Sequence, residues 1–398
     1  MKKLMMLVCA MSIAAMSVMA QESGKNDFNY EFTDVKKIEA TPVKNQASSG
    51  TCWAFSTISF LENELLKAGK GVQDLSEMWI VRWAYYEKAI KYVRMHGTIN
   101  FSQGGATEDV FAMWEKYGIV PEEVYTGLQY GSKTHRHGEI EAALKAYVSS
   151  IINNRQLSTK WLEGLNGILD AYFGELPETF TWEGVEYTPK SYAEHLGLNM
   201  DDYISFTSYT HHPFYTWFPV EVPDNWMWAE SFNLPIDELI SVIDAAIDGG
   251  YSVAWGADVS EQGFIRKNGQ GYAIIPPFYK EDKSDTEEAR WVELTAAERA
   301  MTISNLTAPV KPTEITQEMR QKAFDNYETT DDHGMCIEGL AKDQDGNKFY
   351  RVKNSWDTTY GYDGYLYVSE PFMKYKTMNI AVNKKSLPKA IKAKLGIK

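Results

Sequence analysis

Three side chains that lie far apart in the sequence have the types required for catalysis by a thiol nucleophile: Cys52, His333 and Asn354. A thiol attacks a carbonyl carbon as its thiolate, so it needs a nearby base, and the base needs a partner that orients it. Cys52 lies in NQASSGTCWAFS, where a helix is expected to begin. The unpaired N–H groups and the positive dipole end of a first helical turn favour a negative sulfur. These residues therefore predict covalent catalysis at a carbonyl carbon.

The residues between His333 and Asn354 predict how these two side chains meet. An apolar β-run follows His333, the sequence KDQDGNK then offers a turn, and a second β-run returns the chain to Asn354. We expect the amide oxygen of Asn354 to accept a hydrogen bond from one ring nitrogen of His333, which aims the other nitrogen at the sulfur. Asp331 and Asp332 are interpreted as a solvated turn pair rather than as groups that raise the pKa of His333.

The alternative interpretation of Cys52 is a buried structural thiol. Gln46, six positions before Cys52, and Trp53, directly after it, complete a pattern that favours the nucleophile instead. Cys336, which lies three residues after His333 in a β-run, is interpreted as a small packed apolar residue. Because only these two cysteines follow the first twenty residues, no disulfide framework is expected.

Five short stretches, taken in order, resemble the papain-like cysteine peptidases: NQASSGTCWAFS, DLSE, GGAT, HGM and NSW. The resemblance covers most of residues 40–125 and 250–383. It implies that Cys52 is the nucleophile, that His333 is the general base and then the general acid, and that Asn354 orients the imidazole. It also implies a fold of two lobes with the active site between them.

The same resemblance assigns the residues around the reacting atoms. Gln46 is implied as a side-chain donor to the oxyanion, beside the backbone N–H of the nucleophile, and such preorganised donors commonly contribute about 3 to 4 kcal/mol each. Gly104 and Gly105 match paired glycines that let a substrate backbone approach closely. Trp356 is expected to cover the histidine and asparagine pair, and Trp53 supports the site as the neighbour of the nucleophile.

Two departures from the papain pattern point to one branch of the family. Ser49 and Ser102 stand where papain relatives usually have a bridged pair of cysteines, and the 281 positions from Cys52 to His333 are about twice the usual separation. The branch that contains bleomycin hydrolase and aminopeptidase C resembles this chain in both respects. The resemblance therefore implies an aminopeptidase with peptide substrates. The alternatives are a papain-like endopeptidase and an inactive peptidase fold that binds peptides.

The C-terminal sequence departs from what this branch implies. Its aminopeptidases close the non-primed side of the cleft, which holds the N-terminal part of the substrate, with their own tail, and the terminal carboxylate receives the substrate ammonium. Here residues 384–398 contain six lysines, and this charge repels an ammonium unless the carboxylate of Lys398 itself reaches the cleft. An acidic residue from the large insertion is the alternative anchor for the amine.

The pattern of elements predicts an α+β protein of papain-like, two-lobed architecture, with a helical lobe, a β-barrel-like lobe and large helical insertions. Phe55, Ile58, Leu61 and Leu65 have helical spacing, whereas short β-runs dominate the last third of the chain. The predicted segments are a signal peptide (1–20), an N-terminal segment (21–40), the helical lobe with the nucleophile (41–130), a mostly helical insertion (131–250), the β-rich lobe with the histidine and asparagine (251–383) and a basic C-terminal tail (384–398).

The first twenty residues have the basic start, the apolar run and the Val18-x-Ala20 ending of a secretory signal peptide. We expect an exported bacterial protein, periplasmic or secreted, that is free of the membrane once this segment is removed; a retained anchor is the alternative. Loss of Lys2 and Lys3 changes the formal net charge from -14 to -16. Such an acidic surface repels phosphate backbones, so nucleic acid is excluded as a partner.

No metal or organic cofactor is expected. His135 and His137 form one close pair and His211 and His212 another, but no carboxylate or cysteine stands at a recognisable ligand spacing beside them. These histidines are interpreted as structural or surface residues. The family resemblance implies self-association into a homo-oligomer, with a hexamer as the expected form.

Overall fold

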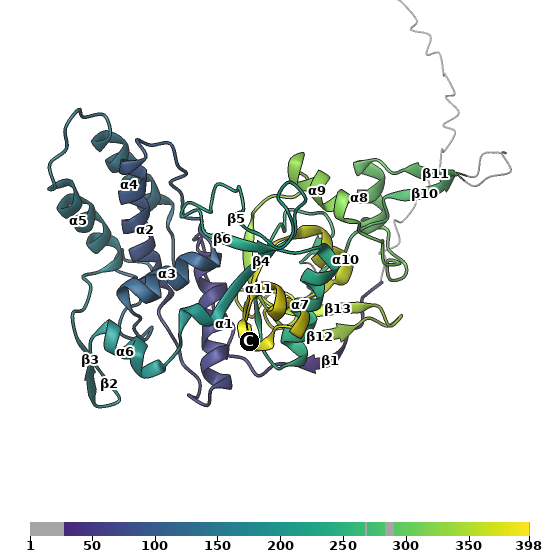
Figure 1. The fold of residues 1–398 in the computed structure, drawn as a ribbon, viewed down its shortest axis with the longest axis horizontal. Helices are drawn as coiled ribbons and strands as arrows, with labels where there is room; N and C mark the ends of the chain where they lie inside the picture. The colour runs from purple at the N-terminus through teal and green to yellow at the C-terminus, as the bar shows by residue number, and fades with distance from the viewer. Residues whose placement is uncertain (1–27, 267–268, 283–289, 398) are drawn as a thin grey trace, which may run out of the picture.

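The structure, a computed structural model, describes residues 28–266, 269–282 and 290–397. The chain forms one lobe of helices and one lobe built on a large β-sheet, so the α+β class predicted from the sequence is confirmed (Figure 1). The predicted signal peptide, residues 1–20, lies outside the described residues. Of the helices that the structure describes, none has the length and apolar character needed to cross a membrane.

The helical lobe is built from helices that share one apolar core. Ser76 caps one of these helices, because its hydroxyl accepts a hydrogen bond from the N–H of Trp79 at 3.0 Å. Gly118 ends another helix with a φ of 73°, which glycine adopts without strain. The helices of this lobe are α1 (Cys52–Lys67), α2 (Glu77–Arg94), α3 (Thr107–Tyr117), α4 (Gly138–Ile151), α5 (Trp161–Phe173) and α6 (Pro189–Leu196).

An 11-stranded sheet organises the second lobe. Its strands are β1 (Thr33–Lys37), β4 (Tyr203–Thr207), β5 (Trp217–Pro219), β6 (Glu230–Asn233), β7 (Val253–Ala257), β8 (Phe264–Ile265), β9 (Tyr272–Ala273), β12 (His333–Lys342), β13 (Lys348–Lys353), β14 (Tyr365–Ser369) and β15 (Thr377–Asn383). They are ordered β5-β6-β4-β15-β7-β12-β13-β14-β9-β8, and β1 pairs with β12. Helices α7 (Ile236–Asp248) and α10 (Glu370–Lys376) pack against this sheet in the second apolar core.

Residues 131–250, predicted as one mostly helical insertion, divide between the two lobes instead. Helices α4, α5 and α6 contribute to the core of the helical lobe, whereas β4, β5 and β6 extend the main sheet and α7 packs on it. A small hairpin of β2 (Phe180–Trp182) and β3 (Val185–Tyr187) precedes α6. Residues 131–250 are therefore part of both lobes rather than a separate helical unit.

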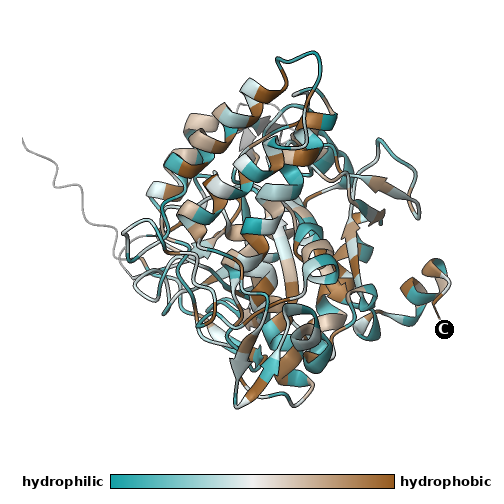
Figure 2. Ribbon diagram, turned by 90° about the vertical axis from the view of Figure 1, so that its left-hand side faces the viewer, coloured by the Kyte–Doolittle hydropathy of each residue, from teal (hydrophilic) through white to brown (hydrophobic). Residues whose placement is uncertain are grey.

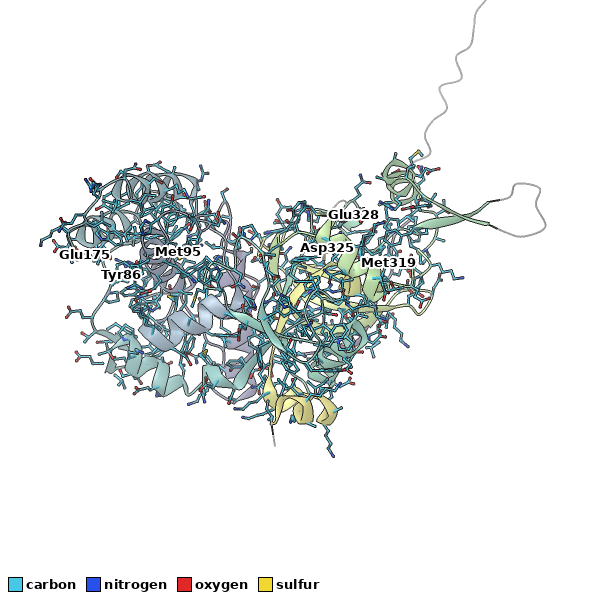
Figure 3. The ribbon with its side chains drawn as sticks, turned by 45° about the horizontal axis from the view of Figure 1, so that its top comes forward. Tyr86, Met95, Glu175, Met319, Asp325 and Glu328 are labelled. Atoms are coloured by element: carbon cyan, nitrogen blue, oxygen red, sulfur yellow. The ribbon has the colours of Figure 1, made fainter. Side chains whose placement is uncertain are left out.

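The remaining elements lie around the sheet lobe and at its junction with the helices. They are η1 (Met200–Asp202), the hairpin of β10 (Tyr279–Asp282) and β11 (Arg290–Glu293), α8 (Ala296–Ser304), α9 (Gln317–Asp325), η2 (Lys384–Ser386) and α11 (Lys389–Leu395). Side chains fill both lobes in Figure 3, where Tyr86 and Met95 mark the helical lobe and Met319 and Asp325 mark the sheet lobe.

The basic C-terminal segment forms the short helix α11 at the outer edge of the molecule (Figure 2). Ile391 is buried in the core of the sheet lobe, and Ile397 packs against the same core. Lys394 donates to both carboxylate oxygens of Glu238 on α7, at 2.6 and 2.7 Å. The tail thus contacts the sheet lobe, while Lys398 lies outside the described residues.

Candidate active site

Close packing of α1 against β12 brings the nucleophile segment and the histidine segment together. Gly334, the residue after His333, lies against the first turn of α1, where a Cβ atom would meet Ser56 Oγ at 2.6 Å, Trp53 Cα at 3.1 Å and the carbonyl oxygen of Cys52 at 3.2 Å. Any side chain at this position would push the strand away from the helix. Glycine is thus the residue that lets the ends of α1 and β12 meet.

The predicted contact between the histidine and the asparagine is present. His333 Nε2 lies 2.8 Å from Asn354 Oδ1 across the β12–β13 hairpin, and both residues are buried. The indole of Trp356 stacks on the imidazole with a centroid distance of 4.5 Å and an interplanar angle of 24°. Because Asn354 Oδ1 accepts a hydrogen bond from the N–H at Nε2, the acceptor nitrogen of a neutral imidazole is Nδ1. The ring is therefore fixed in the tautomer that a general base requires.

Burial opposes charge on both reacting groups. It raises the pKa of the Cys52 thiol to about 12, although the backbone N–H groups of Gly334 and Trp53 lower it in part. Burial also lowers the pKa of His333 to about 4, against the opposing effect of its hydrogen bond to Asn354. Both shifts favour the uncharged form of the group concerned. The N–H of Trp53, in the first turn of α1, favours a negative sulfur as expected, but burial outweighs this effect on the pKa.

Gln46 lies in the same cleft with its amide held in place. Its Nε2 donates to the carbonyl oxygen of Ser49 at 2.7 Å, and its Oε1 accepts from the hydroxyl of Ser355 at 2.6 Å. An amide nitrogen carries two hydrogens, so one N–H is left for an oxygen in the cleft. The arrangement is compatible with the predicted donor to an oxyanion, beside the backbone of Cys52.

One cleft of ≈ 500 Å³ gathers most of the predicted site residues. Asn354 lies behind His333 rather than at the cleft surface, as an orienting residue should. Cys52 is the partly exposed cysteine of the described chain, and Cys336 is buried; both are free thiols. The predicted residues that line the cleft are Gln46, Cys52, Trp53, Gly104, Gly105, His333 and Trp356.

Neighbouring side chains leave no room for a Cβ atom at Gly104 or Gly105. A Cβ atom on Gly105 would meet Asp109 Oδ2 at 2.6 Å and the ring of Trp53 at 2.8 Å, and one on Gly104 would meet the carboxylate of Asp224 at 1.8 Å. Lys88, which no motif in the sequence marks, donates from Nζ to the carbonyl oxygen of Gly104. Its buried ammonium helps to fix the backbone along which a substrate would lie.

The first histidine pair is structural, in agreement with its interpretation. His135 and His137 are buried beside Phe55 and Phe173, and burial lowers their pKa values to about 4 and about 3. Both rings are therefore neutral at physiological pH. They pack as polar aromatic groups in the helical lobe.

The second histidine pair has a partner that the sequence spacing did not reveal. His211 Nε2 and His212 Nε2 lie 2.9 and 3.0 Å from the two carboxylate oxygens of Glu221. Two imidazoles and a carboxylate are donor types found in zinc sites, and these donor atoms lie within 4.8 Å of one another. Each ring already hydrogen-bonds to the carboxylate, however, and none of the three residues lines the cleft. The cluster joins the β4–β5 connection, which carries both histidines, to the start of the β5–β6 connection, which carries Glu221.

Replacing Gly334 with alanine is expected to lower kcat about tenfold and to leave KM nearly unchanged. The added Cβ displaces β12 from α1, and small misplacements of reacting groups are costly in rate. Steady-state kinetics on one peptide substrate measures the effect. Gly167→Ala in α5 is the matched control, because nothing lies within 4 Å of the added methyl group. A Gly334→Ala enzyme with unchanged kcat would show that this contact does not position the pair.

Comparisons with known proteins agree with the fold. The sequence model of the Peptidase C1-like family matches residues 2–281 and 310–397. Bleomycin hydrolase of Mus musculus is 24% identical over 416 residues, which cover 92% of this chain and 85% of the relative. Aminopeptidase C of Streptococcus thermophilus is 24% identical over 413 residues, which cover 92% and 84%. The crystal structure of PepW from Lactobacillus rhamnosis HN001 has the same fold, with a TM-score of 0.67 at 20% identity and coverage of 92% and 84%.

Proposed function

The chain belongs to the Peptidase C1-like family of cysteine peptidases, and from this premise we propose that it is an aminopeptidase that cleaves peptides from a free N-terminus. The curated relatives named aminopeptidase C and bleomycin hydrolase support this proposal along most of their length. The observation that carries it is the cleft in which a thiol, an imidazole held by an asparagine, and paired glycines meet.

The proposed hydrolysis of a peptide bond follows a sequence of steps. As Cys52 Sγ forms a bond to the scissile carbonyl carbon, His333 Nδ1 takes the thiol proton, and the carbonyl π-electrons move to the oxygen. Gln46 Nε2 and the backbone N–H of Cys52 stabilise that oxyanion. Collapse breaks the C–N bond while the imidazolium gives its proton to the leaving amine. His333 then deprotonates a water molecule that attacks the thioester, which releases the carboxylic acid and restores the thiol.

The proposal is tested with two peptides of identical sequence, one with a free N-terminus and one acetylated. The aminopeptidase is expected to shorten the free peptide stepwise and to leave the acetylated peptide intact, with products followed by mass spectrometry. Equal cleavage of both peptides would instead identify a papain-like endopeptidase. Absence of turnover with every peptide would identify a peptidase fold that only binds its ligand.

Export and assembly are further parts of the proposal. Residues 1–20 support export to the periplasm or the medium through their signal-peptide pattern. Self-association into a hexamer is supported by the family resemblance alone. Cell fractionation and light scattering of the purified protein test these two points separately.

A further inference from the structure

A loop of the insertion, residues 220–229, reaches into the active-site cleft and is firmly held there. Asn225 closes the loop on itself, since its Nδ2 donates to the carbonyl oxygens of Val220 and Ala229 and its Oδ1 accepts from the N–H of Ala229. Trp226 anchors the loop to the helical lobe through a 2.5 Å hydrogen bond from Nε1 to Asp109 Oδ2. Asp224, between these fixed points, lines the cleft. Its carboxylate is therefore held in place by the loop.

The carboxylate of Asp224 lies on the paired glycines. Within the described residues, two side chains donate to this carboxylate, and both contact Oδ1: Asn100 Nδ2 at 2.9 Å and Ser102 Oγ at 3.2 Å. Oδ2 is the atom nearest to Gly104, 1.8 Å from where a Cβ would stand, and no described residue donates a hydrogen bond to it. One carboxylate oxygen thus orients the group, and the other is left for a donor in the cleft.

The other carboxylates of the cleft are less suited to receive a cation. Asp331 is partly exposed in the cleft, where burial, and then Asp224, Asp332 and Glu108, raise its pKa to about 7. Burial also raises the pKa of Glu108. Asp332 accepts from the N–H of Ser260 and the hydroxyl of Thr330, both at 3.0 Å, and Glu141 accepts from Gln103 at 2.6 Å. The acidic residues of the cleft are Glu108, Glu141, Asp224, Asp331 and Asp332.

The described part of the basic tail, residues 384–397, supplies no carboxylate to the cleft for the substrate ammonium. Of residues 384–397, none lines the cleft. The helix α11 is held on the sheet lobe by Ile391 and by the pairing of Lys394 with Glu238. A substrate ammonium in the cleft would therefore meet Asp224 rather than these lysines.

We propose that Asp224 binds the α-ammonium group of the substrate and closes the cleft beyond it, so that the loop 220–229 performs the recognition of the free N-terminus. This inference rests on the proposed aminopeptidase function and names the residue that would confer it. An ammonium donates to Oδ2 as a charge-assisted hydrogen bond. An acetylated N-terminus has no charge for Asp224, and its added atoms would overlap the carboxylate that covers Gly104.

A cycle of two enzymes and two substrates tests the proposal. The substrates are a peptide with a free α-ammonium and its analogue with a neutral α-hydroxyl in the same place; the enzymes are the wild type and Asp224→Asn. The wild type is expected to favour the ammonium peptide by about 10- to 100-fold in kcat/KM. Asp224→Asn is expected to lose that preference by lowering kcat/KM for the ammonium peptide and sparing the hydroxyl analogue.

Three controls keep the result decisive. Glu141→Gln removes a carboxylate from another part of the cleft and is expected to retain the preference of the wild type. The rate at which iodoacetamide alkylates Cys52 shows whether the thiol is unaffected in Asp224→Asn. If Asp224→Asn does not fold, Asp224→Ser takes its place in the same comparison of the two substrates.

The outcomes separate this inference from the proposed function. If the wild type already cleaves free and acetylated peptides equally, the aminopeptidase proposal fails before any variant is made. If the wild type discriminates and Asp224→Asn keeps the full preference for the ammonium, the aminopeptidase stands and Asp224 is not its anchor. A fall in kcat/KM for both substrates together with slower alkylation would also overturn the inference, because Asp224 would then act on the thiol.

Discussion

Replacing Cys52 with alanine is expected to lower kcat/KM for peptide hydrolysis by about 10⁵- to 10⁶-fold, to the level left by substrate binding and the oxyanion donors. The loss is this large because the thioester cannot form without the sulfur, and every later step depends on that intermediate. Progress curves at high enzyme concentration measure the residual rate. Iodoacetamide followed by peptide mapping is expected to place the label on Cys52 in the wild type.

Cys336→Ala is the matched control for the loss of a thiol. Cys336 is buried, and its sulfur lies 3.8 Å from Asn63 Nδ2, away from the substrate cleft. This variant is expected to keep the turnover of the wild type, with a modest loss of stability. Normal turnover by Cys52→Ala would move the chemistry to another site and contradict the mechanism given above.

His333→Ala is expected to lower kcat/KM by about 10⁴-fold, because the thiol then has no base that takes its proton. Combined with Cys52→Ala, it should add almost nothing, since the two groups act as one unit. Imidazole added to the solution is expected to restore part of the rate, which a merely structural role would not allow. Alkylation of Cys52 by iodoacetamide should also slow. His195→Ala, a change at an exposed histidine, is expected to leave all of these measurements unchanged.

The pH dependence gives this prediction a second readout. Because only the neutral imidazole accepts a proton, kcat/KM of the wild type should rise through pH of about 4, the pKa of His333. An unfolded histidine titrates near about 6.5, so between these values the unfolded chain binds more protons. The stability contributed by neutral, buried His333 is therefore complete above pH of about 6.5 and is lost as the pH falls toward 4. Melting curves of His333→Ala should lack this part of the acid sensitivity.

The placement of the candidate catalytic residues could be predicted because their signals are local. Cys52 is marked by its neighbours and by the start of a helix, and the single hairpin between His333 and Asn354 fixes how these two meet. The ionisation of Cys52 and His333 could not be predicted in the same way. The pKa values of the thiol and the imidazole depend on burial by both lobes, which the sequence around either residue does not contain.

The cleft wall could not be predicted because its residues come from distant parts of the chain. Asp224 contacts Gly104 across 120 positions, and only the folded loop places its carboxylate there. The fold shows the same limit: β4 is buried along its whole length, so it lacks the alternation that marks a half-exposed strand. Strand β5 has only three residues, too few for any periodicity. Pro223 and Asn225 flank Asp224 and are typical of a turn, but they give no sign of its contact with Gly104.

Ser102, which stands where papain relatives have half of a cystine, donates its hydroxyl to Asp224. Neither cysteine of the described chain takes part in a cross-link. Thiol reductants that keep the nucleophile in its active oxidation state therefore have no covalent bond to break in the described part of the chain. Catalytic competence of the enzyme can vary with the redox poise of its surroundings, while the conformational stability of this part of the fold does not.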